Sequence, residues 1–454
     1  MSAKRESIHG QWSNRWIFIL AATGSAVGLG NIWKFPYITG ENGGGAFVLV
    51  YLLCIAAIGI PIMMAEVLLG RRGRQSPINT MKTLAREEGR SGAWSLLGWS
   101  GVVAGFLILS YYSVIAGWAL AYVLNAGSGA FTDAPAAEIQ GIFTALVASP
   151  GQLIFWHSLF MLMTMLVVAR GVKKGLEVAI RFLMPALLVL LLIMVGYAIN
   201  SGEFVRGLSF LFTPDFSKIS AEGVLIAMGH AFFTLSLGMG AIMIYGSYMP
   251  KNASIAKTSI IVALADTGVA LLAGMAIFPI VFANSLEPGS GPGLIFQTLP
   301  IAFGSMPGGH FFGAVFFILL VLAAWSSAIS LIEPAVAWLV ENKAWTRVKA
   351  SVYCGFATWL MGLGTVLSFN EWSAYTLWGK NFFDLLDFLT SNIMLPLGGL
   401  FIALFAAWVM KSSSTANELT LAESGMAYTS WRFLVRFVTP VAVIIVFLNA
   451  IGVV

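Results

Sequence analysis

The chain has 454 residues, of which 58% are hydrophobic and only 10% are charged, and its mean hydropathy is +0.87. This composition is typical of an integral membrane protein and excludes an ordinary soluble domain. The net charge is +5, which we attribute to basic connections between membrane spans rather than to nucleic-acid binding.

Eleven apolar stretches are long enough to cross a hydrocarbon core. They cover residues 14–37, 44–69, 95–125, 152–169, 176–199, 222–248, 257–284, 311–340, 350–368, 382–410 and 431–453. The pattern predicts an all-α, polytopic membrane protein with eleven transmembrane helices. Several stretches exceed the necessary length, so we expect them to be tilted or broken.

Two of these stretches are interrupted by the same chemistry, with Gly28-Leu29-Gly30 in the first and Gly238-Met239-Gly240 in the sixth. Glycine lets a membrane helix unwind, and unwound backbone at membrane depth is tolerated where it lines a cavity. Paired interruptions in two halves of a chain indicate an ion and substrate site near the bilayer midplane. Close helix packing through small residues is the alternative. Polar Asn31 and Thr234, beside the breaks, favour a site.

The basic connections define an orientation. One side carries Lys4, Arg5, Arg15, Arg71, Arg72, Arg74, Lys82, Arg86, Arg90, Arg170, Lys173, Lys174, Lys251, Lys257, Lys343, Arg347 and Lys349. The opposite connections 126–150 and 285–310 contain no Lys or Arg. The N-terminus is therefore predicted to be cytoplasmic and, with eleven spans, the C-terminus external. The first stretch is too long for a cleavable signal peptide.

The sequence does not support disulfide bonding, metal binding, enzyme activity or ATP-driven transport. Cys54 and Cys354 fall inside apolar stretches and are too few for a disulfide framework or a metal site. The histidines are scattered without metal-ligand spacing at positions 9, 157, 230 and 310. There is no phosphate-binding lysine loop and no nucleophile elbow, so neither an enzyme nor ATP-driven transport is expected.

The first stretch and its continuation contain the runs GSAVGLGNIWKFPY over 24–37 and ENGGGAF over 41–47. Together these runs resemble the first-helix signature of the neurotransmitter:sodium symporter family. The resemblance continues through FFTLSLGMG over 232–240, Ser326-Ser327 and Asp387, so it covers nearly the whole chain. Eleven spans rather than twelve are similar to the bacterial amino-acid branch of the family, which implies a location in the bacterial inner membrane.

The resemblance implies the LeuT fold, with two inverted repeats of five spans whose first helices, spans one and six, are broken. The implied parts are a cytoplasmic N-terminal segment (1–13), the first repeat (14–199), an external connection (200–221), the second repeat (222–410), a cytoplasmic connection (411–430) and an eleventh span (431–454).

It also implies two sodium sites with only oxygen ligands, which suit a hard monovalent cation. The first would use the Ala26 carbonyl, Asn31, Thr234, Asp266 and the substrate carboxylate. The second would use the carbonyls of Gly24, Val27 and Ala323 and the hydroxyls of Ser326 and Ser327. For the two serines, hydrogen bonding to their own helix is the alternative.

The implied substrate site has a polar and an apolar part. The Gly30 amide and the Tyr112 hydroxyl would hold a carboxylate, while the carbonyls of Ala26, Phe233 and Thr234 and the Ser236 hydroxyl would hold an ammonium group. The side-chain pocket would consist of Ile108, Phe233, Met239 and Leu331. Monoamine-carrying relatives have an aspartate at the position of Gly28, so glycine implies a substrate with its own carboxylate. The apolar lining implies a hydrophobic side chain.

Chloride is not expected to be required. Chloride-dependent relatives use neutral ligands in the seventh span and recruit an anion beside the first sodium. Here Asp266 stands at the position of a family asparagine, and Ala270 stands at the usual anion-coordinating serine. A fixed carboxylate would supply the compensating negative charge.

The gates follow from the same resemblance. Lys34 and Asp387 would form the outer gate with Phe233 as its lid, and Glu66 would cap backbone groups freed by the unwound segments. His230 lies one turn before Phe233 and is expected to be a buried structural residue rather than part of this gate.

For the inner gate, family members commonly carry an arginine three residues before the first tryptophan, whereas His9 occupies that place before Trp12. Glu341 matches the acidic partner. Either Arg5 reaches Glu341 along a different path or His9 makes a weaker contact, and Tyr248 is the expected third member.

The segment from Gly175 to Pro185 at the start of the fifth span is a candidate hinge. Proline supplies no N–H to the helix, so this segment can open with little loss. The resemblance suggests that opening admits cytoplasmic water to the second sodium site. A static proline kink is the alternative.

The chain is thus predicted to be a Na⁺-coupled symporter that imports hydrophobic L-amino acids by alternating access. The alternatives are a non-transporting amino-acid sensor with the same site, an ion channel and, least supported, a membrane enzyme. A sensor would need a signalling part, and only the polar connection 411–430 is long; a channel would need a continuous polar pore. The expected partners are an amino acid and membrane lipid, with no nucleic acid and no obligate protein partner.

Overall fold

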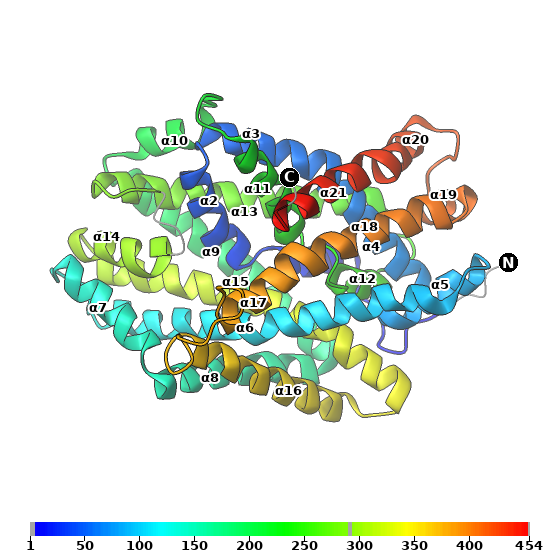
Figure 1. Ribbon diagram of the computed structural model, residues 1–454, viewed down its shortest axis with the longest axis horizontal. Helices are drawn as coiled ribbons and strands as arrows, with labels where there is room; N and C mark the ends of the chain where they lie inside the picture. Colours follow the sequence, from blue (N-terminus) through cyan, green and yellow to red (C-terminus); the bar gives the residue numbers. More distant parts are fainter. Residues whose placement is uncertain (1–4, 289–292, 453–454) are drawn as a thin grey trace.

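The computed structural model describes residues 5–288 and 293–452. The ends of the predicted N-terminal segment and of the eleventh span, and part of the 285–310 connection, lie outside these residues. The described chain is helical and contains no strand, only two isolated β-bridges. Most helices run along the long axis of the molecule, and the short connecting helices gather at its two ends (Figure 1).

Nine helices are long and apolar enough to cross a membrane without interruption among the described residues. They are Gly45–Gly73 (α3, η2 and α4), Gly92–Gly127 (η3 and α6), Pro150–Ala169 (α8), Val172–Ile199 (η4 and α9), Ile255–Ala283 (α13), Gly309–Lys343 (α15), Arg347–Ser368 (α16), Phe382–Val409 (α17, η6, α18 and η7) and Met426–Ala450 (α20, η8 and α21). Each corresponds to one of the predicted spans.

The first predicted span is broken. Helix α1 (Arg15–Ala26) ends where Val27 becomes extended, and η1 (Gly30–Lys34) with α2 (Phe35–Glu41) continues at an angle of 53°. The sixth predicted span is also in two pieces, α11 (Ala221–Thr234) and α12 (Ala241–Ser247). The two breaks lie at the predicted glycines. The nine uninterrupted helices, the bent first span and the two-piece sixth span, all among the described residues, are consistent with eleven predicted spans.

The second break is a tight backbone turn. Ser236, Gly238 and Gly240 have positive φ angles of 54°, 81° and 77°, a region that favours glycine. A Cβ atom on Gly238 would lie 2.5 Å from the Leu395 carbonyl oxygen of α18 (Leu395–Leu404). The glycine therefore allows the unwound segment to pack directly against a neighbouring backbone.

The polar connections form short helices rather than open loops. These are α5 (Pro77–Glu87), α7 (Ala136–Val147), α10 (Phe204–Phe212), η5 (Leu294–Thr298), α14 (Leu299–Ser305) and α19 (Ser412–Leu419). The span Met426–Ala450 begins five residues before its predicted start because Tyr428 is anchored, its hydroxyl lying 2.7 Å from the Thr415 hydroxyl.

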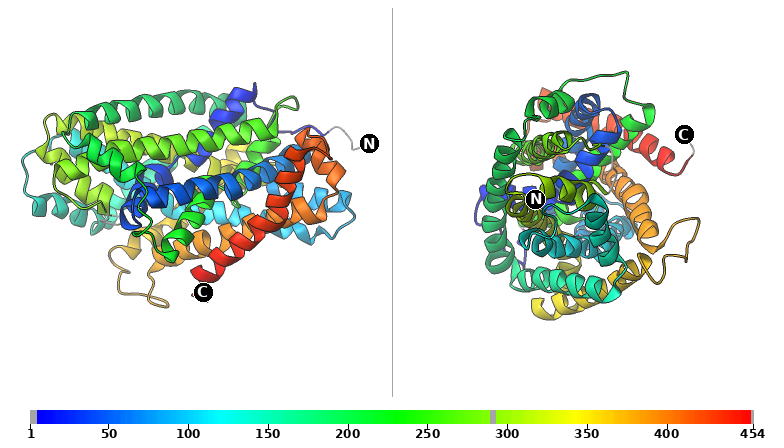
Figure 2. Two further views of the ribbon diagram at one scale, coloured as in Figure 1. Left: turned by 90° about the horizontal axis from the view of Figure 1, so that it is seen from above. Right: turned by 90° about the vertical axis from the view of Figure 1, so that its left-hand side faces the viewer.

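Helices α6 (Ser95–Gly127) and α15 (Gly309–Lys343) lie side by side along the centre of the bundle. Their approach is close, since a Cβ on Gly105 would come within 2.6 Å of the Leu331 carbonyl oxygen. The broken helices pack beside this pair, and α21 (Thr439–Ala450) crosses the outside of the bundle obliquely (Figure 2). The two breaks are thus enclosed by long helices.

Candidate functional site

The two helix breaks are joined to each other and to α4 (Ile60–Gly73). The Ser236 hydroxyl donates a hydrogen bond of 2.8 Å to the Ser25 carbonyl, across the two breaks. The buried Glu66 carboxylate accepts hydrogen bonds from the amides of Gly238 (3.1 Å) and Met243 (3.3 Å). Unwound backbone needs such partners because water is excluded from it. Glu66 therefore occupies the capping position expected of it.

Asn31, Thr234 and Asp266 meet behind the first break, and all three are buried. The Asn31 amide nitrogen donates to an Asp266 carboxylate oxygen at 2.7 Å and to the Thr234 hydroxyl at 3.1 Å. The Thr234 hydroxyl donates to the other Asp266 carboxylate oxygen at 3.0 Å. Three side chains from η1, α11 and α13, predicted as ligands of the first sodium, are thus in mutual contact.

The residues predicted for the second sodium also come together. The Ser327 hydroxyl lies 3.0 Å from the Val27 carbonyl oxygen and 3.5 Å from that of Gly24. The Ser326 hydroxyl lies 3.0 Å from the Ala323 carbonyl oxygen and 3.5 Å from that of Val27. Ser327 thus contacts the first break from another helix. The shorter contact of Ser326, to Ala323, lies within its own helix, so for Ser326 hydrogen bonding to its own helix stays an alternative.

Both clusters fit a hard cation. The donor atoms are hydroxyl, carbonyl, amide and carboxylate oxygens, which suit Na⁺ rather than a soft metal. In the first cluster the Asn31 side-chain oxygen accepts from the Gly28 amide at 3.0 Å, so that its nitrogen faces Asp266. For Asn31 to act as a ligand, its amide must turn so that the oxygen faces the ion. The Asp266 carboxylate then supplies the charge.

A small cavity of about 30 Å³ lies between the breaks. The predicted substrate residues that line it are Ala26, Gly28, Gly30, Ile108, Tyr112, Phe233, Ser236, Met239 and Leu331. Of the predicted set only Thr234 is not on its surface; it lies in the adjacent polar cluster. A cavity of this size does not hold a whole amino acid, so binding requires side chains around it to move.

Gly28 leaves no room for a side chain. A Cβ atom there would lie 2.5 Å from the Ser327 hydroxyl oxygen and 2.7 Å from the Tyr112 hydroxyl oxygen. The Tyr112 hydroxyl in turn accepts a hydrogen bond from the Leu29 amide at 3.2 Å. The glycine thus allows the break, α6 and α15 to converge on one point.

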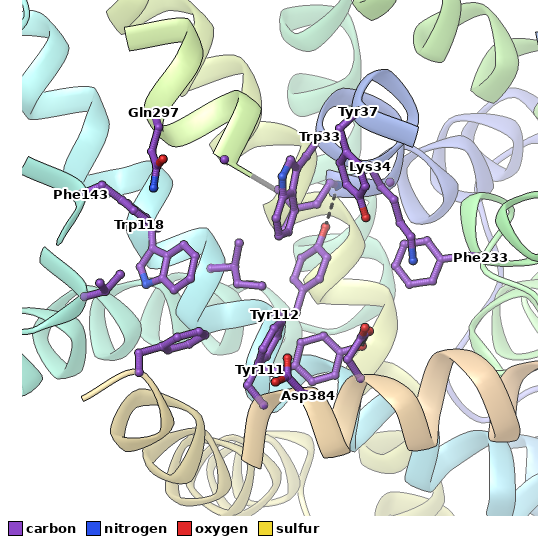
Figure 3. Close-up of a pocket in the computed structure, with 18 residues that line it drawn as sticks. Trp33, Lys34, Tyr37, Tyr111, Tyr112, Trp118, Phe143, Phe233, Gln297 and Asp384 are labelled. Atoms are coloured by element: carbon purple, nitrogen blue, oxygen red, sulfur yellow. Dashed lines mark hydrogen bonds between the residues drawn. The ribbon is translucent and has the colours of Figure 1, made fainter. Parts of the chain in front are cut away.

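A larger cavity of about 490 Å³ lies on the outer side of Phe233. Its lining includes Trp33, Lys34, Tyr37, Tyr111, Trp118, Gln297, Asp384 and Asp387. Figure 3 shows the side chains that it labels among these gathered around one space. Leu29, Gly30, Tyr112 and Phe233 line both this cavity and the small one. Phe233 therefore stands between the two.

The predicted outer-gate residues share this cavity, but Lys34 has an aromatic partner. Its ammonium nitrogen lies 4.7 Å from the centre of the Phe233 ring, an attractive cation–π distance. Asp387 instead accepts hydrogen bonds from the hydroxyls of Ser391 (2.9 Å) and Tyr111 (3.3 Å). Direct pairing of Lys34 with Asp387 stays a prediction. His230 is buried, with its ring against those of Phe35 and Tyr51, which also contact each other; neither of its ring nitrogens has a hydrogen-bond partner among the described residues.

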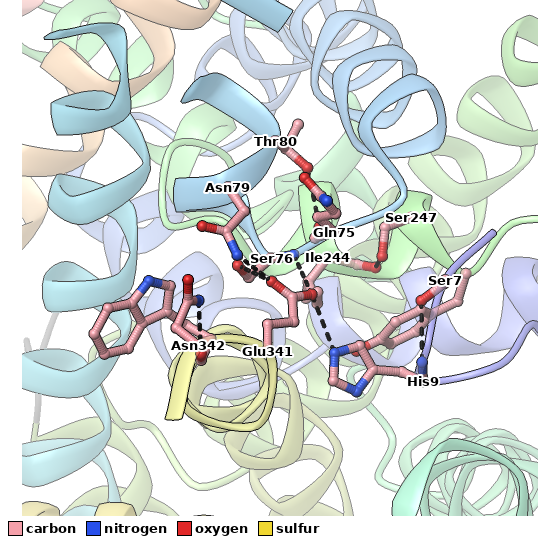
Figure 4. A network of polar contacts seen from close by, with 12 residues as sticks. Ser7, His9, Gln75, Ser76, Asn79, Thr80, Ile244, Ser247, Glu341 and Asn342 are labelled. Atoms are coloured by element: carbon pink, nitrogen blue, oxygen red, sulfur yellow. Dashed lines mark hydrogen bonds and ion pairs between the residues drawn. The ribbon is translucent and has the colours of Figure 1, made fainter. Parts of the chain in front are cut away.

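On the side of the small cavity opposite to the larger one, His9 rather than Arg5 contacts Glu341. The sequence had left this choice open. Its Nε2 lies 3.1 Å from Glu341, and both side chains are buried. Glu341 also accepts hydrogen bonds from the Ser76 amide and hydroxyl and from Asn79 (2.8 Å) (Figure 4). Arg5, the other candidate, pairs with Glu87 of α5 and does not contact Glu341.

Sequence reasoning missed a second ion pair in this region. Tyr248, the expected third member of the gate, packs its ring against that of His9, with 5.9 Å between the ring centres. It donates a hydrogen bond of 2.7 Å to Glu333, which pairs with Arg347. Trp12 seals the same side, with its ring nitrogen donating to the Tyr245 carbonyl at 3.1 Å. Glu333 has no exposed surface. Its place inside an apolar stretch was the sequence signal that could have predicted this ion pair, because an acid within a membrane span usually has a partner.

The predicted hinge is helical in the structure. Gly175 lies in η4 (Val172–Leu176) and Pro185 lies inside α9 (Glu177–Ile199). A Cβ on Gly175 would lie 2.1 Å from the Val167 carbonyl oxygen, so glycine is needed for the packing of this turn. Glu177 pairs with Arg181 and accepts a hydrogen bond from the Ser13 amide at 3.2 Å. The hinge is thus tied to the N-terminal segment.

The sequence matches the sodium:neurotransmitter symporter family over residues 9–134 and 137–454. The chain belongs to this family. A sodium-dependent transporter, YhdH, of Bacillus subtilis (strain 168) is 40% identical over 98% of each chain. A sodium-dependent transporter of Haemophilus influenzae is 34% identical over 96% of this chain and 97% of its own. The symporter is therefore a sodium-dependent transporter and not an enzyme.

The symporter also resembles a solved structure, that of MhsT in complex with L-phenylalanine. The two chains are 46% identical, the TM-score is 0.89, and the match covers 97% of this chain and 99% of the other. The LeuT-type architecture predicted for the symporter is thereby confirmed. It was predicted from the resemblance of the runs over 24–37, 41–47 and 232–240 to the family signature.

Proposed function

We propose that this protein is a Na⁺-coupled symporter that imports hydrophobic L-amino acids across the bacterial inner membrane by alternating access. The observation that carries the proposal is the meeting of the two helix breaks around an apolar cavity flanked by two oxygen clusters. Phenylalanine bound to MhsT, at 46% identity, supports the same substrate class.

The polar groups at the breaks fit an amino acid. The Gly30 amide and the Tyr112 hydroxyl line the cavity and would hold the carboxylate, and the carbonyls near Ala26 with the Ser236 hydroxyl would hold the ammonium group. Ile108, Leu331 and the flexible Met239 would contact the side chain. Two Na⁺ ions would be carried with the substrate, one at Asn31 and Asp266 and one at Ser326 and Ser327, without chloride.

This stoichiometry provides enough free energy for import. One charge moved through 100 mV yields about 2.3 kcal/mol, and a tenfold concentration ratio yields about 1.4 kcal/mol. Two Na⁺ ions would therefore supply roughly 7 kcal/mol, which corresponds to about 10⁵-fold accumulation. The ions must favour the outward-facing state, because a ligand shifts an equilibrium only by its differential affinity.

Uptake of labelled amino acids into proteoliposomes, with and without an inward Na⁺ gradient, tests the proposal. Leucine, isoleucine, phenylalanine and tryptophan are expected to accumulate only with the gradient, and their decarboxylated amines are not. Binding without uptake would favour the amino-acid sensor. Equal uptake without Na⁺, or equal affinity for an amino acid and its amine, would contradict the proposal.

The proposed orientation, with a cytoplasmic N-terminus and an external C-terminus, has its own test. Single cysteines introduced at Ser7 and at Ser128, in a variant lacking Cys54 and Cys354, are expected to react with an impermeant thiol reagent from opposite sides. Ser128 follows the end of α6 and is exposed. Labelling of both positions from one side would overturn the orientation.

A further inference from the structure

Two arginines lie on the membrane span Met426–Ala450, away from the transport site. Arg432 is in α20 (Met426–Phe433) and Arg436 is four residues later, in η8 (Leu434–Val438). The Arg436 guanidinium carbon lies 4.0 Å from the centre of the Trp408 ring in η7 (Phe405–Val409). The Trp408 ring nitrogen donates to the Arg436 carbonyl at 3.1 Å. The two span ends therefore form one basic and aromatic surface. We call it the corner, and it consists of Trp408, Arg432, Arg436 and Phe437.

This corner has positive charge without an acidic partner. Among the described residues, no ion pair includes Arg432 or Arg436. Arg432 donates to the Tyr428 hydroxyl and to the Ala407 carbonyl, and the buried Nε of Arg436 has no hydrogen-bond partner. Like charges four residues apart on a helix repel each other. An anion bound to both would remove this repulsion.

Glu423, the acid nearest to Arg432 along the chain, is exposed and is in no ion pair among the described residues, whereas two further acids are engaged elsewhere. Glu418 of α19 pairs with Arg71, and a Glu88 carboxylate oxygen accepts a hydrogen bond from the Lys411 amide. Lys411 lies two residues after the end of η7 and adds a third basic residue to this end of the two spans. None of these acids pairs with Arg432 or Arg436, so the corner can accept an anion from outside the chain.

The corner faces the bilayer. Trp408, Phe433 and Phe437 are 50%, 55% and 46% exposed, and all three lie on helices long and apolar enough to span a membrane. Trp408 lies in the last turn of its span, where tryptophan is enriched at the boundary between hydrocarbon and head groups. Figure 2 shows α21, which continues from η8, on the outside of the bundle.

We propose that this corner, formed by Trp408, Arg432, Arg436 and Phe437, binds an anionic phospholipid. The phosphate lies between the two guanidinium groups, and an acyl chain lies over the exposed rings of Phe433 and Phe437. Basic pockets between membrane helices hold lipid head groups by this chemistry. The bound lipid joins the ends of the spans Phe382–Val409 and Met426–Ala450, and its binding does not depend on which amino acid is carried.

The test uses the purified, delipidated full chain in detergent. The thermal unfolding midpoint is measured while phosphatidylglycerol, phosphatidylcholine or inorganic phosphate is added. Phosphatidylglycerol alone is expected to raise the midpoint. In Arg436→Gln the concentration for the half-maximal rise is expected to increase about fivefold, the effect of one basic residue at a lipid surface.

Arg206→Gln is the matched control. The Arg206 guanidinium carbon also lies over an aromatic ring, 4.6 Å from that of Phe282, but α10 is at the other end of the molecule (Figure 1), and the side chain is 62% exposed beside Glu203. Its response to phosphatidylglycerol should equal that of the unchanged protein. If Arg436→Gln does not fold, Arg432→Gln is measured by the same criterion.

Three results would overturn the proposal. One is an equal response to phosphatidylglycerol and phosphatidylcholine, which would indicate a general effect of lipid. The second is the same rise with inorganic phosphate, which would indicate a free-anion site. The third is an Arg436→Gln or Arg432→Gln variant with an unaltered phosphatidylglycerol response, which would place the lipid elsewhere.

Discussion

Individual hydroxyl groups connect the helices that meet at the two breaks. Ser236 reaches from the second break to the Ser25 carbonyl of the first, and Ser327 reaches from α15 to the Val27 carbonyl. Ser236 does so with a positive φ angle, a conformation that disfavours non-glycine residues by about 1–3 kcal/mol. The strain is offset by a hydrogen bond that glycine could not form.

The first prediction concerns Ser327. In Ser327→Ala the second proposed sodium site loses one hydroxyl ligand, so the half-maximal Na⁺ concentration for binding and uptake is expected to rise, by an amount equivalent to about 1–3 kcal/mol. Ser368→Ala is the control, because the Ser368 hydroxyl donates only within its own helix, to the Thr365 carbonyl. Unchanged Na⁺ dependence in Ser327→Ala would remove Ser327 from the ligands.

The second prediction concerns chloride. Because Asp266 is buried against Asn31 and Thr234, its carboxylate can balance a cation without a second anion. Uptake by the unchanged protein is therefore expected to persist when chloride is replaced by gluconate at constant Na⁺. Collapse of uptake in gluconate would show that the carboxylate is insufficient.

The variant Asp266→Asn extends this prediction. It removes a charge worth roughly 1–4 kcal/mol to a neighbouring cation, so Na⁺ affinity is expected to fall by a factor of about 5 to about 1,000. Adding Ala270→Ser should make the remaining uptake responsive to chloride. The single variant Ala270→Ser serves as the control and should remain indifferent to chloride.

At the scale of helices, the sequence was sufficient to locate the spans and both breaks. Hydropathy gives span ends within a few residues because burial in a bilayer depends on composition rather than on particular contacts. The exception is the eleventh span, which begins at Met426 rather than at 431. Its early start depends on the contact of Tyr428 with Thr415, and no local pattern reports such a contact.

The third prediction concerns the helix that contains Pro185. Pro185→Ala restores an N–H that can bond to the Arg181 carbonyl, which stabilises α9 against opening. Release of substrate to the inside is expected to slow while binding from outside stays within about twofold. Pro279→Ala, a change of another proline inside a helix, α13, is the control. Parallel loss of binding and transport in Pro185→Ala would contradict the hinge.

At the scale of the whole molecule, the two sides of the substrate cavity differ. On one side an open space of about 490 Å³ reaches Phe233, and on the other Trp12, Tyr248 and the acids Glu333 and Glu341 are packed together. The structure is thus closed at the end that bears the N-terminus. Opening that end would break the His9–Glu341 contact and expose the Glu333–Arg347 pair.

The fourth prediction tests this closure. Glu333→Gln leaves the Arg347 guanidinium without its carboxylate, and breaking a buried pair costs about 3–5 kcal/mol. The thermal unfolding midpoint is expected to fall, and a cysteine placed at Ser7 should become more reactive. Glu371→Gln, on an exposed acid, is the control and should change neither. An unchanged midpoint in Glu333→Gln would show that the pair does not hold the inner side closed.

The part of the site that lies within single sequence segments was predictable. Gly28, Asn31 and Ser236 lie at breaks visible in the sequence, and the structure brings them together. The partners of Arg5 and Tyr248 were not predictable, because the choice between Glu87, Glu333 and Glu341 depends on how distant helices pack. Long side chains at the ends of helices have several acids within reach, and sequence spacing does not rank them.

The crowding around Gly28 limits how this transporter can change its cargo. Any side chain at position 28 meets the Ser327 hydroxyl, a proposed ligand of the driving ion. An aspartate introduced there to bind an amine would therefore disturb the proposed sodium site as well as change the substrate specificity. A change toward amine transport at position 28 is therefore expected to need a compensating shift of Ser327 or Tyr112, which links substrate selectivity to sodium binding.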